Sequence, residues 1–227
     1  PAASTKESAV ELRRVEGIYA KGKGRNNIKE AQAVVDEIVR RLRDPSLRHL
    51  SIGVVTLNTE QQRTIEDLLD EQRRKLSEIE PYFHESTGIT PVFVKNLESV
   101  QGDERDVIIL SLGYGPTEPG AKTMSMNFGP LNKSGGERRL NVAITRATTE
   151  VLLFSSFDSG MIDLSRTTSM AVEHLKNYLE FAERGVSALA AIRFAEHGID
   201  QFDSPYEEMV AQQLRDKGWK VQTQVGV

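Results

Sequence analysis

The sequence predicts an α/β fold with a mainly parallel sheet, helices on both of its faces, and a C-terminal helical extension. Three runs have the length and apolar composition of strands buried on both faces: SIGVVTL, DVIILSLGY and EVLLFSS. Segments with apolar residues at spacings of three and four alternate with these runs. Because strands that alternate with helices are joined by crossovers, they are expected to pair in parallel.

The predicted elements begin with an extended segment over residues 10–20. A positively charged loop, KGKGRNN, leads into an amphipathic helix over residues 28–44, which either Asn26 or Asn27 can cap. For this loop, a solvated role is favoured over contact with a phosphate backbone. Further strands are expected at residues 51–57, 92–97, 106–114 and 150–156, and further helices at 58–79, 135–147, 168–184 and 185–198.

Composition and charge narrow the class of protein. The 29 basic and 33 acidic residues give a net charge of −4, which argues against a strongly basic nucleic-acid coat and still allows a local basic groove. The absence of cysteine excludes disulfides and thiolate metal sites, and the four histidines lack metal-ligand spacing. No apolar run approaches the ~18 residues of a membrane span. We therefore expect a cytoplasmic protein without membrane contact.

The segment LESVQGDERDVIILS, residues 97–111, places polar groups between two strands. Gly102 allows a tight turn and close approach of a ligand to the backbone. Gln101 offers a donor and an acceptor, and Glu104 offers two acceptor oxygens. Such a loop at a strand end can hold a nucleotide, and a charged turn without a ligand is the equal alternative.

The segment GGERRLNVAITRA, residues 135–147, combines arginines with an apolar stripe at helical spacing, formed by Leu140, Ala143, Ile144 and Ala147. Arg139 and Arg146 are seven residues apart, so on a helix they share another face at a separation of ~10 Å. A helix docked closely on a sheet can mount a guanidinium that reaches a γ-phosphate. The alternative is surface salt bridging with Glu104, Asp106 or Glu137.

Three segments in order resemble motifs of superfamily 1 helicases of the Upf-like type. IGVVTLNTEQQRTIEDLL is similar to motif IV, SVQGDERDVIILS to motif V, and GERRLNVAITRA to motif VI. The resemblance implies that residues 1–157 form the second RecA-like domain, with three layers, of a two-domain motor driven by ATP. In that family the last motif VI arginine, here Arg146, contacts the γ-phosphate.

The resemblance also implies roles for other residues. Of the first motif VI arginines, Arg138 and Arg139, the second is the better candidate to contact the nucleotide or an acidic loop. Gln101, Gly102 and Glu104 correspond to the nucleotide-binding part of motif V, with the acid on the ribose. The residues implied to face single-stranded DNA or RNA are Thr56, Asn58 and Ser99.

Motif IV departs from the family pattern, because Leu57 and Asn58 stand where the family often has Pro-Tyr. A stacking aromatic is therefore not expected from this motif. Gln61 or Gln62 is expected to contribute polar contacts to the strand instead.

Two parts that such a motor needs are missing from the sequence. A phosphate-binding G-x-x-x-x-G-K-[ST] loop is approached only by GPTEPGAKT, residues 115–123, where Ala121 moves the lysine out of register. We expect the P-loop and the acids for Mg²⁺ in an upstream RecA-like domain of the same polypeptide, which mainly binds ATP and Mg²⁺. Both ends of the sequence look cut, and this fragment alone is expected to be inactive.

The pattern changes after residue 157. Residues 158–200 are expected to form a helical linker, and residues 201–227 look like a new start with a cap, helix, turn and strand. This last stretch resembles the opening of a Vsr-like or restriction-endonuclease-like nuclease domain, and the resemblance implies a metal-associated carboxylate at Glu207, or at Glu208. No metal site is expected within this chain itself. The alternative is a solvated acidic pair on an amphipathic helix.

The expected function is the C-terminal motor half of an ATP-dependent superfamily 1 helicase or translocase that moves on single-stranded nucleic acid. Two alternatives stay open. One is a RecA-like binding module without turnover, and the other is the motor subunit of a nuclease acting on DNA.

Overall fold

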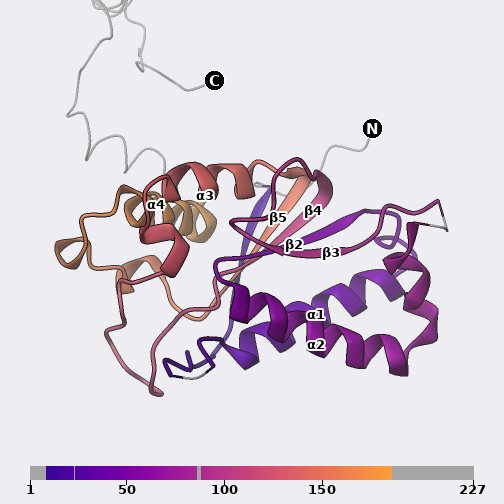
Figure 1. The fold of residues 1–227 in the computed structure, drawn as a ribbon, viewed down its shortest axis with the longest axis horizontal. Helices are drawn as coiled ribbons and strands as arrows, with labels where there is room; N and C mark the ends of the chain where they lie inside the picture. The colour runs from indigo at the N-terminus through magenta and orange to yellow at the C-terminus, as the bar shows by residue number, and fades with distance from the viewer. Residues whose placement is uncertain (1–8, 23, 86–87, 186–227) are drawn as a thin grey trace, which may run out of the picture. The chain divides into compact units, whose positions relative to one another are not determined.

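A computed structural model describes residues 9–22, 24–85 and 88–185, which form a sheet between two layers of helices (Figure 1). The five strands run in the order β1-β5-β4-β2-β3, and every neighbouring pair is parallel. They are β1 Val10–Arg14, β2 Ile52–Thr56, β3 Phe93–Asn96, β4 Arg105–Ser111 and β5 Ala147–Ser155. The predicted RecA-like α/β class is confirmed.

Helices cover both faces of this sheet (Figure 1). The helices α1 Ile28–Arg43 and α2 Thr59–Lys75 lie on one face, and α3 Gly136–Ile144 and α4 Met170–Arg184 lie on the other. The short 3₁₀ helices are η1 Ser77–Phe83, η3 Gly129–Asn132, η4 Ser159–Met161 and η5 Leu164–Arg166. None of the helices in the described ranges has the length and apolar character needed to cross a bilayer.

The central strands fill two separate cores because successive side chains of a strand point to opposite faces. In β4, Val107 and Ile109 pack with α1 and α2, whereas Ile108 and Leu110 pack with α3 and α4. All four side chains are fully buried. Burial on both faces is the reason that this run is continuously apolar.

The structure decides or corrects two of the predicted helix ends. Asn27, and not Asn26, caps α1, because its side chain accepts a hydrogen bond from Glu30 N. The single helix expected over residues 58–79 is wrong in its second part, since α2 ends at Lys75 and η1 follows. Pro81 lies within η1, where its ring and missing N–H disfavour a continued α-helix.

The helix α4 matches the one expected over residues 168–184, and it docks on the domain. Its buried side shares the core of α3 and consists of Ala171, Val172, Leu175 and Leu179. The chain up to Gly185 forms one compact unit. A domain boundary at residue 157 stays a prediction, and the nuclease-like stretch with Glu207 lies outside the described residues.

Candidate functional site

The helix α3 is shorter than the sequence predicts. It ends at Ile144, and Thr145 caps it. The Thr145 hydroxyl bonds back to the carbonyl oxygens of Asn141 and Val142 at 2.9 and 3.2 Å. This local bonding satisfies the last turn and releases the next residue from the helix.

Arg146 therefore lies at the amino end of β5 and not on α3. Arg105 N donates to Arg146 O at 3.1 Å, and Arg105 pairs with Ala147, so the β4–β5 ladder starts here. The prediction of a helical face shared by Arg139 and Arg146 is wrong. Ala147 likewise belongs to β5 and not to the apolar stripe of the helix.

The Arg146 side chain is fixed toward the loop that precedes β4. Its Nε donates to Val142 O at 3.0 Å, and its Nη1 lies 3.8 Å from Glu104 Oε1. The Arg146 side chain is 22% exposed, whereas that of Glu104 is 62% exposed. Gln101 and Gly102 on the same loop are exposed, and Gly102 has a φ of 87°, a conformation that favours glycine. Residues expected from two motifs thus meet at the amino edge of the sheet.

Arg139 supports the loop before α3. Its Nη1 donates to Ser134 O at 3.0 Å and to Pro130 O at 3.4 Å. Arg138 is 89% exposed, and its Nε lies 3.9 Å from Glu137 Oε1. Both arginines therefore contact groups of their own neighbourhood, and Arg146 is the one placed against the motif V loop.

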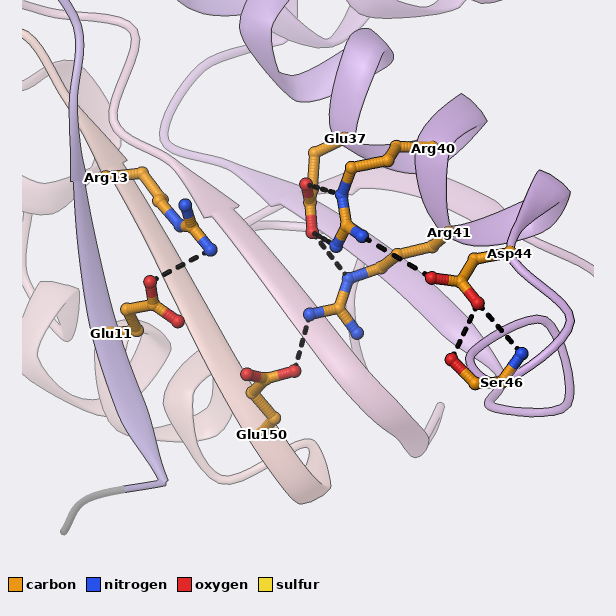
Figure 2. A network of polar contacts seen from close by, with 8 residues as sticks. All are labelled: Glu11, Arg13, Glu37, Arg40, Arg41, Asp44, Ser46 and Glu150. Atoms are coloured by element: carbon orange, nitrogen blue, oxygen red, sulfur yellow. Dashed lines mark hydrogen bonds and ion pairs between the residues drawn. The ribbon is translucent and has the colours of Figure 1, made fainter. Parts of the chain in front are cut away.

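A second cluster at the amino edge joins α1 to β5 (Figure 2). Arg41 has a side chain only 4% exposed, between Glu37 and Glu150. Its Nε lies 2.7 Å from Glu37 Oε1, and its Nη2 lies 2.6 Å from Glu150 Oε2. Two carboxylates therefore compensate one buried cation, although Nη1 has no hydrogen-bond partner.

The three residues expected to face a strand follow the carboxyl ends of β2 and β3, but their side chains differ in access. Thr56 is fully buried, and its hydroxyl donates to Asn58 O at 2.8 Å. Asn58 caps α2, with Oδ1 accepting from Gln61 N at 2.7 Å. Ser99 is exposed, and its Oγ accepts a hydrogen bond from Asn96 N at 3.2 Å.

Of the two glutamines expected to contribute a polar contact to the strand, Gln61 is not available, because its side chain is buried. Its Nε2 donates to Asn27 O and Ser111 Oγ at 3.2 and 3.1 Å, and its Oε1 accepts from Asn27 N at 2.8 Å. Gln62 is partly exposed and binds Asn96 Nδ2 at 2.8 Å. The sequence position of Gln61 shows its place on the helix but not the strands that cover it.

Sequence reasoning also missed a buried acid, Glu30, in the first turn of α1. Its Oε1 accepts from Ser111 Oγ at 2.8 Å and from Gly113 N at 2.7 Å, and its Oε2 accepts from Ser156 Oγ at 3.1 Å. Burial raises the pKa of Glu30 to about 7, against the opposing effect of these donors. The spacing Asn27-x-x-Glu30 is a capping pattern and was the available signal for a special role.

Beside this network, a groove of about 430 Å³ opens at the carboxyl edge of the sheet. We call it the carboxyl-edge groove, and it is formed by the loop before α1, the start of α2 and the segment 125–133. Its lining includes Lys21, Arg25, Asn58, Tyr114 and Lys133. The strand β4 separates the two edges by roughly 20 Å, at ~3.3 Å per residue. The groove and Arg146 are therefore different sites.

The described residues contain no group of three or more His, Cys, Asp or Glu side chains that could hold a metal. In the structure, no helix follows the segment 115–123 before η3.

Comparison with known proteins gives one matching family model and two similar proteins that are named as helicases. Residues 5–158 match the family model described as AAA domain. An uncharacterized ATP-dependent helicase of Mycoplasma pneumoniae is 36% identical over 171 residues, which are 74% of this chain and 14% of that protein. One of Mycoplasma genitalium is 37% identical over the same share of each chain. The chain thus spans 14% of the length of these relatives.

Proposed function

This chain belongs to the AAA domain family and carries a helicase-type motor domain, and from that premise we propose that it is the C-terminal motor half of a superfamily 1 helicase or translocase. ATP lies between this domain and an upstream RecA-like domain, which also holds Mg²⁺. The whole protein moves along single-stranded DNA or RNA as the cleft closes and opens. This chain alone does not turn over ATP.

The position of Arg146 against the motif V loop carries this proposal, and its ion pair with Glu104 is what the salt-bridging alternative also expects. This ion pair joins the last arginine of motif VI to the acid of motif V across 3.8 Å. The Val142 carbonyl fixes the Nε of Arg146 and leaves the outer guanidinium nitrogens beside an exposed loop. In this proposal Arg146 stabilises charge on the transferring phosphoryl group, because a guanidinium already held in place needs little reorganisation.

Gln101, Gly102 and Glu104 complete the nucleotide contact in this proposal. The exposed Glu104 carboxylate accepts hydrogen bonds from the ribose, and Gln101 senses the nucleotide through its amide. Arg139 positions the loop before α3 through Ser134 and contributes indirectly. At the other edge, Asn58, Ser99 and the backbone at Thr56 face the strand.

The test is the Arg146→Ala substitution in the full-length protein, with Arg74→Ala as the matched control on the exposed side of α2. An arginine that acts on the phosphoryl group contributes about 10³-fold or more to kcat. We expect strand-stimulated ATP hydrolysis to fall by about that factor for Arg146→Ala and to stay unchanged for Arg74→Ala. Hydrolysis that survives Arg146→Ala would instead support a binding module without turnover.

The nuclease-like interpretation of residues 201–227 stays a prediction. In this interpretation Glu207 would hold a divalent metal. Divalent-metal-dependent cleavage of DNA by the full-length protein, abolished in Glu207→Gln and retained in Arg146→Ala, is the result that this interpretation requires.

A further inference from the structure

We propose that the helix α4 positions Arg146 for its contact with the phosphoryl group, and that it does so through α3. The proposal rests on the proposed function and deepens it, because it adds a positioning element to the same nucleotide site. The helix α4 lies beyond residue 158, where the match to the AAA domain family ends. It also lies outside the three helicase-like motifs, so its contribution to the site is additional to theirs.

The helix α3 depends on its neighbours for its position. It has nine residues, and no side chain caps its amino end at Gly135. Helices of fewer than about 12 residues are marginal on their own, and packing supplies most of their stability. Within the described residues α3 contacts α4, η3 and β4. Because Val142 O on α3 accepts the hydrogen bond of Arg146 Nε, a shift of α3 would also move the guanidinium.

The helices α3 and α4 lie side by side and approach closely at the first turn of each (Figure 1). A Cβ built on Gly136 would lie 3.1 Å from the Cβ of Ala171, which is tighter than an ordinary van der Waals contact. Ala171 is 2% exposed, and Val172 and Leu175 are fully buried in the core that α4 shares with α3. A close-packed core of this kind leaves no free space for a larger side chain. The size of residue 171 therefore sets the distance between the two helices.

The other end of α4 is bound to the segment that follows β5. Ser159 in η4 donates to both carboxylate oxygens of Glu183, from its N at 2.9 Å and from its Oγ at 2.7 Å. Lys176 Nζ donates to Ser159 O at 2.9 Å. Since β5 starts directly after Arg146, α4 contacts the elements on both sides of this arginine: α3 before it, and the end of β5 through η4.

The first experiment enlarges residue 171 in the full-length protein. Ala171→Val adds two methyl groups at the contact with Gly136 and should push α3 from its place. A displacement of about 1 Å can cost about 10²-fold in rate, so we expect kcat for strand-stimulated ATP hydrolysis to fall by about tenfold or more. The half-saturating concentration of single strand should not change. Met170→Val is the matched control, because it introduces the same residue at the preceding position, where the side chain is 60% exposed.

A double-substitution cycle separates positioning of the arginine from a general loss of packing. If α4 acts through Arg146, the Arg146→Ala variant has no guanidinium left to misplace, and adding Ala171→Val should lower kcat no further. An equal fall of kcat in both backgrounds overturns the proposal. An unchanged kcat for Ala171→Val in the original protein overturns it as well.

A second variant leaves the apolar core intact. Glu183→Ala removes the acceptor of Ser159 at the far end of α4, and it should lower kcat by a smaller factor than Ala171→Val, again only where Arg146 is present. Glu173→Ala is its matched control, because Glu173 is exposed on the same helix. Should Ala171→Val fail to fold, Glu183→Ala is judged by the same criteria.

The proposed function and this inference fail separately. If Arg146→Ala keeps its strand-stimulated ATP hydrolysis, the proposed function fails and this inference fails with it. If Arg146→Ala loses hydrolysis while Ala171→Val and Glu183→Ala match the original protein, this inference fails alone.

Discussion

The two ends of α1 contact the sheet through different polar interactions: a buried acid with neutral donors at one end, and a buried cation with two carboxylates at the other. At its amino end Glu30 is buried among hydroxyl and amide donors at the carboxyl edge, with no ion pair to it among the described residues. At its carboxyl end Arg41 is buried between Glu37 and Glu150 at the amino edge (Figure 2). The first arrangement raises the pKa of an acid to about 7, and the second requires full charges. The carboxyl edge should therefore respond to pH, and the amino edge to loss of a single charge.

The largest expected effect on stability comes from Arg41→Met, which removes the buried cation that lies between Glu37 and Glu150. Removing one partner of a buried ion pair typically costs about 3–5 kcal/mol of unfolding free energy. Arg40→Met is the matched control, since Arg40 contacts the same Glu37 with a side chain that is 50% exposed. The control should cost less than about 1 kcal/mol. Equal losses, measured by urea unfolding with circular dichroism, would show that Arg41 is not the compensating charge.

The next effect is a pH dependence from Glu30. Because its pKa is raised from 4.5 to about 7, the folded protein keeps a proton that the unfolded chain releases between these values. The stability from Glu30 is thus fully present below the unfolded pKa and is lost as pH rises through 7. At 1.36 kcal/mol per pKa unit, the loss is on the order of 3 kcal/mol.

Glu30→Gln isolates this contribution, since glutamine retains an acceptor for Ser111 and Gly113. We expect the difference in unfolding free energy between the original protein and the variant to change steadily between pH 5 and pH 7. A difference that is flat with pH would rule out Glu30 as the titrating group.

A smaller effect concerns the docking of α3, whose Val142 carbonyl oxygen accepts a hydrogen bond from Arg146. A Cβ on Gly136 would lie 1.9 Å from the Leu131 carbonyl oxygen, whereas a Cβ on Gly135 meets nothing within 4 Å. Gly135 has a φ of 75°, so alanine at this position would strain the backbone but would not clash with a neighbouring atom. Gly136→Ala should cost about 2 kcal/mol or more, and Gly135→Ala about 1 kcal/mol. The reverse order in thermal unfolding would contradict the close docking of α3.

The smallest stability change is expected for Glu104→Gln. Its side chain is 62% exposed and lies 3.8 Å from Arg146, so the pair should contribute less than about 0.5 kcal/mol. Loss of a charged acceptor for the ribose should nevertheless raise the Kd for a non-hydrolysable ATP analogue about tenfold in the full-length protein. An unchanged Kd would remove Glu104 from the nucleotide contact.

The sequence predicted the strands well and the polar side chains less well. Continuous apolar runs such as that of β4 predict a strand buried on both faces, because exposure of either face to water would be unfavourable. The spacing of Arg146 fits a helix, and only the bonds of Thr145 and the pairing with β4 end that helix earlier. Gln61 and Glu30 look like helix surface residues in the sequence. Their burial depends on strands that are distant in the chain, so local patterns did not contain it.

The separation of the two edges is tested most directly by titrating ATP hydrolysis of the full-length protein with single strand. Arg146→Ala should lower the plateau rate by about 10³-fold and leave the half-saturating strand concentration unchanged. Asn58→Asp should raise that concentration at least tenfold and leave the plateau unchanged. If either substitution moves both quantities together, the assignment of nucleotide to the amino edge and strand to the carboxyl edge is contradicted.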